Sequence, residues 1–175
     1  MGTLTRSPLP ACLLLIGSLL LIAPAATAAP PATMPSGRIV LTISGKVAKP
    51  NRGKEAVFDM AMLEQLPQRS HHVATPWYPR MVTFRGPLLR DVLAQVGASG
   101  SAIQAVAIND YSVQIPFADS RQFEVIVATR MNGRPMSPRD KGPLFIIYPY
   151  GRFSPTEVKR YYERSVWQLD TLRVQ

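Results

Sequence analysis

The sequence predicts an α+β fold in which short strands and a few short helices form a single domain. The first observation is the alternation of apolar side chains from Arg38 to Ser44, which is typical of a half-buried strand. The second is a clear amphipathic helix, expected from Gly86 to Gly97. The third is the dipeptide Asn132-Gly133, which separates two strand-like apolar runs and predicts a tight hairpin turn.

The other elements follow from local signals along the chain. Further strands are expected at residues 56–58, 102–108, 111–115 and 165–174, and a single helical turn at 117–122. Helix ends are marked by Asp59 as a cap, Pro67 as a stop, Pro87 in a first turn and Gly97 as a left-handed end. The capping box Ser154 to Glu157 predicts a last helix. Trp167, Leu169 and Leu172 are expected in the core.

The loop after Asn132-Gly133 combines charge with proline. The run before the turn, Glu124 to Met131, is apolar and β-branched. The run after the loop, Leu144 to Tyr148, suits a strand that is covered on both faces. Because prolines fix φ, the charges between these runs are expected to be held at a sheet edge, where sites tend to lie. These charged residues are Arg134, Arg139, Asp140 and Lys141.

Residues 1–28 have the features of a secretory signal peptide. Arg6 supplies the positive start, residues 12–23 form an apolar run, and Ala26-Thr27-Ala28 is a small-residue cleavage site. The alternative, an uncleaved anchor, is disfavoured because the apolar run is shorter than the roughly 20 residues that a membrane span needs. Residues 29–37 are expected to form a flexible tail, and residues 38–175 the domain.

Cysteine and histidine chemistry is limited by composition. Cys12 is the only cysteine, so the cleaved chain would have no disulfide, no thiolate ligand and no cysteine nucleophile. His71 and His72 are the only histidines, and neighbours on a strand point to opposite faces. The pair therefore cannot readily chelate one metal ion, and a strand-end role is favoured.

The chain is basic, with a formal net charge of +9. From Arg130 to Arg164 there are eight basic and three acidic residues, a local excess of +5. Nucleic acid is a poor partner for an exported protein, which leaves two interpretations. The cations either form a solvated face, as charge runs usually do, or they attract an anionic ligand or an acidic partner surface.

The segment from Asn132 to Pro149 carries a family resemblance. It contains N-G-x-P at Asn132 to Pro135, x-G-P-L at Lys141 to Leu144, and an apolar strand that ends in Tyr-Pro. This pattern resembles the C-terminal part of the sulfite-oxidase-like, molybdopterin-binding oxidoreductase domain. The resemblance extends over residues 38–174 and implies a single mixed-sheet domain of the sulfite-oxidase-like molybdopterin-binding fold.

The resemblance also implies where this chain departs from catalytic members. Their molybdenum-ligating cysteine corresponds to Val73, or to Thr75 under a shifted alignment, and Pro76 replaces a glycine. Lys141 stands where those members have a histidine, and no arginine follows until Arg152. Trp77 and the helix start at residues 84–88 match the family.

The family scaffold implies one pocket, with molybdopterin as a possible cofactor and no metal ligand. Its predicted lining residues are Trp77, Asn109, Tyr111, Lys141, Tyr148 and Arg152. An alternative makes Trp77 and Tyr148 ordinary core aromatics. The resulting hypothesis is a non-catalytic exported module that binds an anionic or pterin-like small molecule, or an exported or membrane protein partner. The competing hypotheses are a molybdopterin-dependent oxidoreductase with a non-cysteine molybdenum environment, and a purely structural role.

The cleavage site predicts a periplasmic or secreted protein whose mature chain begins at Ala29 and does not span the membrane. The mass of the protein recovered from the exported fraction checks this prediction. A mass that includes residues 1–28 would contradict it.

Overall fold

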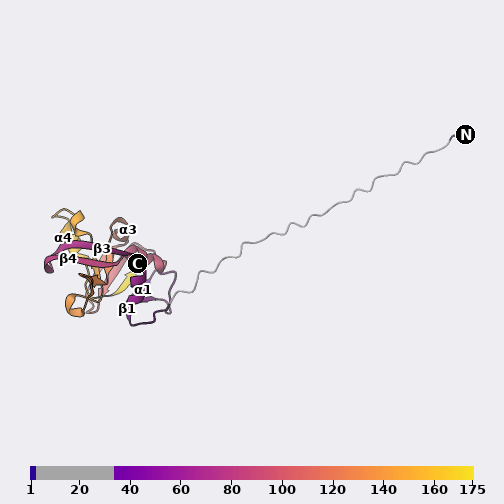
Figure 1. Ribbon diagram of the computed structural model, residues 1–175. Helices are drawn as coiled ribbons and strands as arrows, with labels where there is room; N and C mark the ends of the chain where they lie inside the picture. Colours follow the sequence, from indigo (N-terminus) through magenta and orange to yellow (C-terminus); the bar gives the residue numbers. More distant parts are fainter. Residues whose placement is uncertain (3–33) are drawn as a thin grey trace. The chain divides into compact units, whose positions relative to one another are not determined.

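The computed structural model describes residues 1–2 and 34–175. The predicted signal peptide beyond Gly2, and the first part of the predicted tail, lie outside the described residues. Within the described part of the chain, no helix has the length and apolar character needed to cross a membrane. Residues 34–175 alternate short strands with short helices, in agreement with the predicted α+β class (Figure 1).

The largest sheet has five strands in the order β2-β1-β11-β5-β6. β1 and β11 pair in parallel, whereas the other neighbours pair antiparallel, so the sheet is mixed as predicted. The last strand of the chain thus lies in the middle of the sheet. The bounds are β1 Ile39–Gly45, β2 Ala56–Asp59, β5 Ala102–Ala107, β6 Ser112–Pro116 and β11 Leu169–Val174.

The remaining strands form two antiparallel sheets. The first has the order β3-β4-β8-β9 and the second is the pair β10-β7. Their bounds are β3 Gln68–Thr75, β4 Tyr78–Pro87, β7 Ile126–Ala128, β8 Arg130–Met131, β9 Arg134–Pro135 and β10 Phe145–Ile147. Every residue of β7 and β10 is buried. This agrees with the strand predicted, from its unbroken apolar run, to be covered on both faces.

The helices are short. They are α1 Met60–Gln65, α2 Leu89–Gln95, α3 Phe117–Gln122 and α4 Val158–Glu163, with 3-10 turns η1 Pro138–Asp140 and η2 Tyr150–Arg152. The predicted start of α2 was wrong: Pro87 ends β4, opposite Gln68, and Leu88 bridges to Ile126. Sheet pairing therefore extends through the proline, and the helix begins only at Leu89.

The turn at Asn132-Gly133 has the predicted conformation, with φ angles of 49° and 79°. It joins the very short strands β8 and β9. The two longer runs on either side also pair, through β7 and β10. The local turn signal was therefore correct, but the turn closes a smaller hairpin than the apolar runs indicated.

Asp59 joins the start of the domain to α1. One carboxylate oxygen accepts from the backbone N–H of Met62 at 2.9 Å, as predicted for a helix cap. The other accepts from the N–H groups of Ser36 and Gly37, both at 2.8 Å. Hydrogen bonds, first from Met62 and then from Gly37, hold the pKa of Asp59 below its ordinary value. Ser36 and Gly37, which belong to the predicted flexible tail, are thus fixed.

A buried polar cluster joins α3 to the residues that directly follow β10 and α4. The Tyr148 hydroxyl donates to the Asp119 carboxylate at 2.8 Å, and Arg164 Nη1 contacts the same oxygen at 2.7 Å. Tyr148 is 0% exposed and Asp119 4%. Burial, followed by the charge of Asp119, raises the pKa of Tyr148, which therefore remains a hydrogen-bond donor. The cluster satisfies a carboxylate that could not otherwise be buried without a large cost.

A Tyr148→Phe substitution removes the hydroxyl and leaves the ring. We expect the free energy of unfolding to fall by about 1 kcal/mol, because Asp119 loses one donor but keeps Arg164. Urea denaturation measures the change. Tyr111→Phe, at a tyrosine that is 51% exposed, is the matched control and should leave the unfolding free energy unchanged. Equal effects at both positions would contradict a structural role for the Tyr148 hydroxyl.

Candidate functional site

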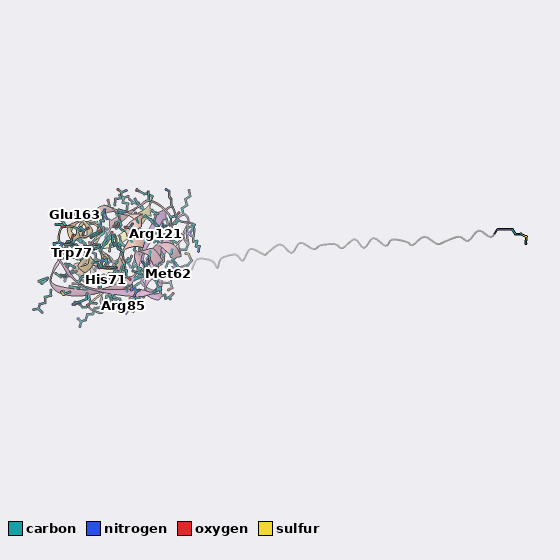
Figure 2. All side chains as sticks on the ribbon, turned by 90° about the horizontal axis from the view of Figure 1, so that it is seen from above. Met62, His71, Trp77, Arg85, Arg121 and Glu163 are labelled. Carbon is teal, nitrogen blue, oxygen red and sulfur yellow. The ribbon has the colours of Figure 1, made fainter. Side chains whose placement is uncertain are left out.

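Trp77 lies in the turn between β3 and β4 and is surrounded by aromatic rings. Its ring centroid lies 5.1 Å from that of Phe145, 5.7 Å from Tyr162, 5.9 Å from Trp167 and 6.2 Å from Tyr150. Figure 2 labels Trp77 on the same side of the domain as Glu163 of α4, which agrees with its contact to Tyr162 of that helix. The end of the β3–β4 hairpin therefore packs against α4 through aromatic contacts.

Trp167 extends this cluster toward the surface. Tyr111 stacks on it with an interplanar angle of 13° and a centroid separation of 6.5 Å. The Lys141 ammonium lies 4.9 Å from the centroid of the Trp167 ring, within cation–π range. Trp77, Trp167 and Lys141 are half-buried, and Tyr111 is exposed. We call these four residues, Trp77, Tyr111, Lys141 and Trp167, the aromatic platform.

The structure brings four of the six predicted pocket residues to this region. Trp77, Tyr111 and Lys141 belong to the platform itself. Asn109 lies in the same turn as Tyr111, and its side-chain oxygen accepts from the Tyr111 backbone N–H at 3.3 Å. Asn109 therefore supports the turn that carries Tyr111.

The other two predicted residues lie elsewhere, so the six do not line one pocket. Tyr148 is part of the core: its ring packs on Phe123 and Tyr161, and its hydroxyl is bound to Asp119. Arg152 is exposed and lines a separate depression of about 240 Å³ together with His71 and His72. Tyr148 directly follows the fully buried strand β10, whereas Arg152 lies in the 3-10 turn η2. A resemblance in sequence order alone did not show where these two side chains point.

Sequence reasoning missed the central residue of the platform. Trp167 was expected only as a core residue, although it contacts both Tyr111 and Lys141. One signal was available: the chain has only two tryptophans, and both lie in this cluster. No sequence pattern drew attention to Gln168, the residue that directly follows Trp167.

Tyr78, which follows Trp77 in the chain, and Tyr150, whose ring contacts Trp77, are neutral hydrogen-bond donors. Burial raises the pKa of Tyr150, and burial followed by the charge of Asp140 raises that of Tyr78. The Ser165 hydroxyl donates to the Tyr161 carbonyl at 2.6 Å, so the 2.6 Å bond between Tyr150 and Ser165 is donated by Tyr150. Tyr78 donates to the Asp140 carbonyl at 3.2 Å and so contacts the loop that carries Lys141.

The residues at the predicted ligand position do not fit a thiolate-bound molybdenum centre. Val73 is 6% exposed, belongs to the hydrophobic core and offers only hydrocarbon. Thr75 is 9% exposed, and its Oγ1 is buried without a hydrogen-bond partner. A neutral hydroxyl is a poor substitute for the soft, charged sulfur ligand that tunes such a metal. We therefore derive no chemical step through molybdenum.

The two histidines behave as strand residues with separate partners. His71 Nε2 lies 2.6 Å from the Glu124 carbonyl, which can only accept, so this nitrogen carries a proton. His72 Nδ1 lies 2.9 Å from the Thr83 hydroxyl. Within the part of the chain that the structure describes, no three histidine, cysteine, aspartate or glutamate residues cluster as metal ligands.

The basic segment divides into paired and unpaired cations. Arg130 forms an ion pair with Glu64 and Arg164 one with Asp119, both at 2.7 Å. Lys141 forms no ion pair with a carboxylate of residues 34–175. The platform therefore combines stacked aromatic faces with one ammonium group that is free to meet an anion.

Comparison with known proteins agrees with this fold. The family model for the oxidoreductase molybdopterin binding domain matches residues 29–159, well over half of the chain. No curated protein matches the sequence. This chain therefore belongs to the oxidoreductase molybdopterin-binding domain family, which confirms the sulfite-oxidase-like resemblance of its sequence.

Proposed function

We propose that this protein is an exported, non-catalytic binding member of its family, and that the aromatic platform binds a planar anion. The observation that carries the proposal is the position of the Lys141 ammonium, 4.9 Å from the Trp167 ring on which Tyr111 stacks. A planar molecule can pack against the aromatic faces, and its negative charge is attracted to the Lys141 ammonium. Pterin-like carboxylates and other flat aromatic anions have this chemistry.

The available ligand chemistry supports a role in binding rather than in redox catalysis. Val73 and Thr75 provide no thiolate, and the platform itself contains no carboxylate, histidine or cysteine. Its groups can stack, donate hydrogen bonds and hold a charge. These are the properties of a recognition site, in which a few polar groups orient a ligand on an apolar surface.

An acidic surface of an exported or membrane protein is a second form of the same ligand chemistry. Tyr111 is 51% exposed and Ile108, in the same turn, is 55% exposed. Exposed aromatic and aliphatic side chains beside a cation resemble the anchor residues of protein interfaces. An acidic protein partner would cover Ile108, whereas a small anion would leave it exposed. Footprinting of the free and the bound protein distinguishes these two outcomes.

A Lys141→Met substitution keeps most of the side-chain length and removes the charge. We expect the Kd for pterin-6-carboxylate to rise about tenfold, the equivalent of roughly 1.4 kcal/mol. Quenching of tryptophan fluorescence measures binding, because both tryptophans lie in the platform. Two comparisons isolate the charge: Lys159→Met, at an exposed lysine of α4, and neutral pterin, which lacks the carboxylate. Equal Kd values for wild type and Lys141→Met would contradict the proposal.

A second candidate function is a molybdopterin-dependent oxidoreductase with a non-cysteine metal environment. The observation that favours it is the unpartnered, buried hydroxyl of Thr75, because a buried polar atom without a partner is costly unless a bound group supplies one. Thr75 lies two residues before Trp77, at the end of β3.

Metal analysis decides between the two candidates. We expect protein made in molybdopterin-rich cells to contain no stoichiometric molybdenum and to lack the visible absorption of a molybdenum–sulfur bond. Val73→Cys and Thr75→Cys are the matched variants, each restoring a thiolate at one of the two aligned positions. Stoichiometric molybdenum in the wild type, with sulfite- or sulfoxide-dependent turnover, would overturn the non-catalytic proposal.

A further inference from the structure

Gln168 connects the three segments that form the exposed part of the platform. Its backbone N–H donates to the Lys141 carbonyl, and its own carbonyl accepts from the Ile108 N–H, both at 2.9 Å. Its side-chain Nε2 donates to the Pro138 carbonyl, also at 2.9 Å. One residue thus joins the loop that carries Lys141, the turn that carries Tyr111 and the chain directly after Trp167.

The backbone around this junction is unusual. Among the described residues, four that are not glycine have positive φ: Asp110, Asn132, Lys141 and Gln168. Asn132 belongs to an ordinary hairpin turn, whereas the other three lie in the segments that Gln168 connects. Such conformations persist only where surrounding interactions fix them, and they concentrate at functional sites. The three hydrogen bonds of Gln168 provide that fixation.

The side chain of Gln168 sets the distance between these segments. Gln168 is half-buried and directly follows Trp167, whose ring meets Tyr111 and Lys141. Its amide donates to the carbonyl of Pro138, the first residue of η1, and Lys141 is the C-cap of that turn. Asparagine carries the same amide on a side chain that is one methylene shorter, and it tolerates positive φ. Asparagine would therefore keep the backbone conformation but could not hold Pro138 at the same distance.

We propose that Gln168 is the positioning residue of the aromatic platform. It holds Lys141 over the Trp167 ring, and it holds the Tyr111 turn against the same ring, so that an approaching anion meets one preformed surface. The part of the inference that concerns ligand affinity rests on the proposed function. The placement of Lys141 does not, because the local charge beside Trp167 can be measured with a simple anion.

Iodide quenching of tryptophan fluorescence provides this measurement, with neutral acrylamide as the comparison. A cation beside Trp167 raises the local iodide concentration and leaves acrylamide unaffected. Lys141→Met calibrates the full effect of the charge. For Gln168→Asn we expect the iodide quenching constant to fall about twofold, with an unchanged acrylamide constant and a thermal midpoint near that of the wild type. Gln122→Asn, at an exposed glutamine of α3, is the matched control and should change neither constant.

Each other outcome has a defined meaning. An unchanged iodide constant in folded Gln168→Asn overturns the inference, as does an unchanged constant in Lys141→Met. A parallel rise of the iodide and acrylamide constants also overturns it, because the role would then be general packing. If Gln168→Asn does not fold, Gln168→Gly replaces it, since glycine accepts the positive φ without strain. If Gln168→Asn shows the twofold loss of iodide quenching and the wild type binds no pterin-6-carboxylate, the result supports the positioning role and contradicts the proposed function.

Discussion

The insertion of β11 between β1 and β5 is the constraint on which the rest of the structure depends. β11 is the last strand of the chain, pairs in parallel with β1 and antiparallel with β5, and lies at the centre of the five-stranded sheet. The closeness of this packing is visible at Gly45, where φ is 86° and a Cβ would collide with the Val174 carbonyl. The sheet cannot form from local contacts alone, because its central strand comes from the far end of the sequence.

The position of the aromatic platform depends on this insertion of β11. Trp167 and Gln168 directly precede β11, so the pairing of Leu169 with Ala107 fixes the positions of both residues. Trp167 forms a β-bridge with Phe145, the first residue of β10, and the Leu169 N–H donates to the Leu144 carbonyl at 3.0 Å. The strand ladder thereby fixes the backbone on which the platform is built, and the loops need only to be joined to it. A site built on rigid strands keeps its geometry better than one built on loops alone.

The fold does not require the chemistry of the catalytic family members. Val73, one of the two positions predicted to correspond to the family's cysteine, is buried and pairs with Val82 in the ladder between β3 and β4. A buried apolar residue there adds to the core, so the scaffold needs no thiolate at this position to be stable. Membership of the family therefore establishes the architecture, whereas function must be argued from the groups at the site.

Local signals predicted most of the elements, and long-range contacts explain the failures. Asp59 and Asn132-Gly133 act through their immediate neighbours, and both were predicted correctly. Pro87 was placed in a helix because nothing in the local sequence reveals its pairing with Gln68 across the hairpin. Gln168 carries no signal, since glutamine rarely adopts positive φ and its three partners are distant in sequence.

Fixing the platform in advance has a consequence for what it can bind. A lysine on a free loop would lose side-chain and backbone freedom on meeting a ligand, and that loss would subtract from affinity. Here the left-handed backbone of Lys141 and its carbonyl bond to Gln168 remove much of that freedom before binding. A single ammonium can then be sufficient for a small, flat anion, whereas a flexible acidic peptide would need further contacts to offset its own ordering. The preformed geometry thus supports the proposal of a rigid planar anion as the ligand, rather than a disordered partner.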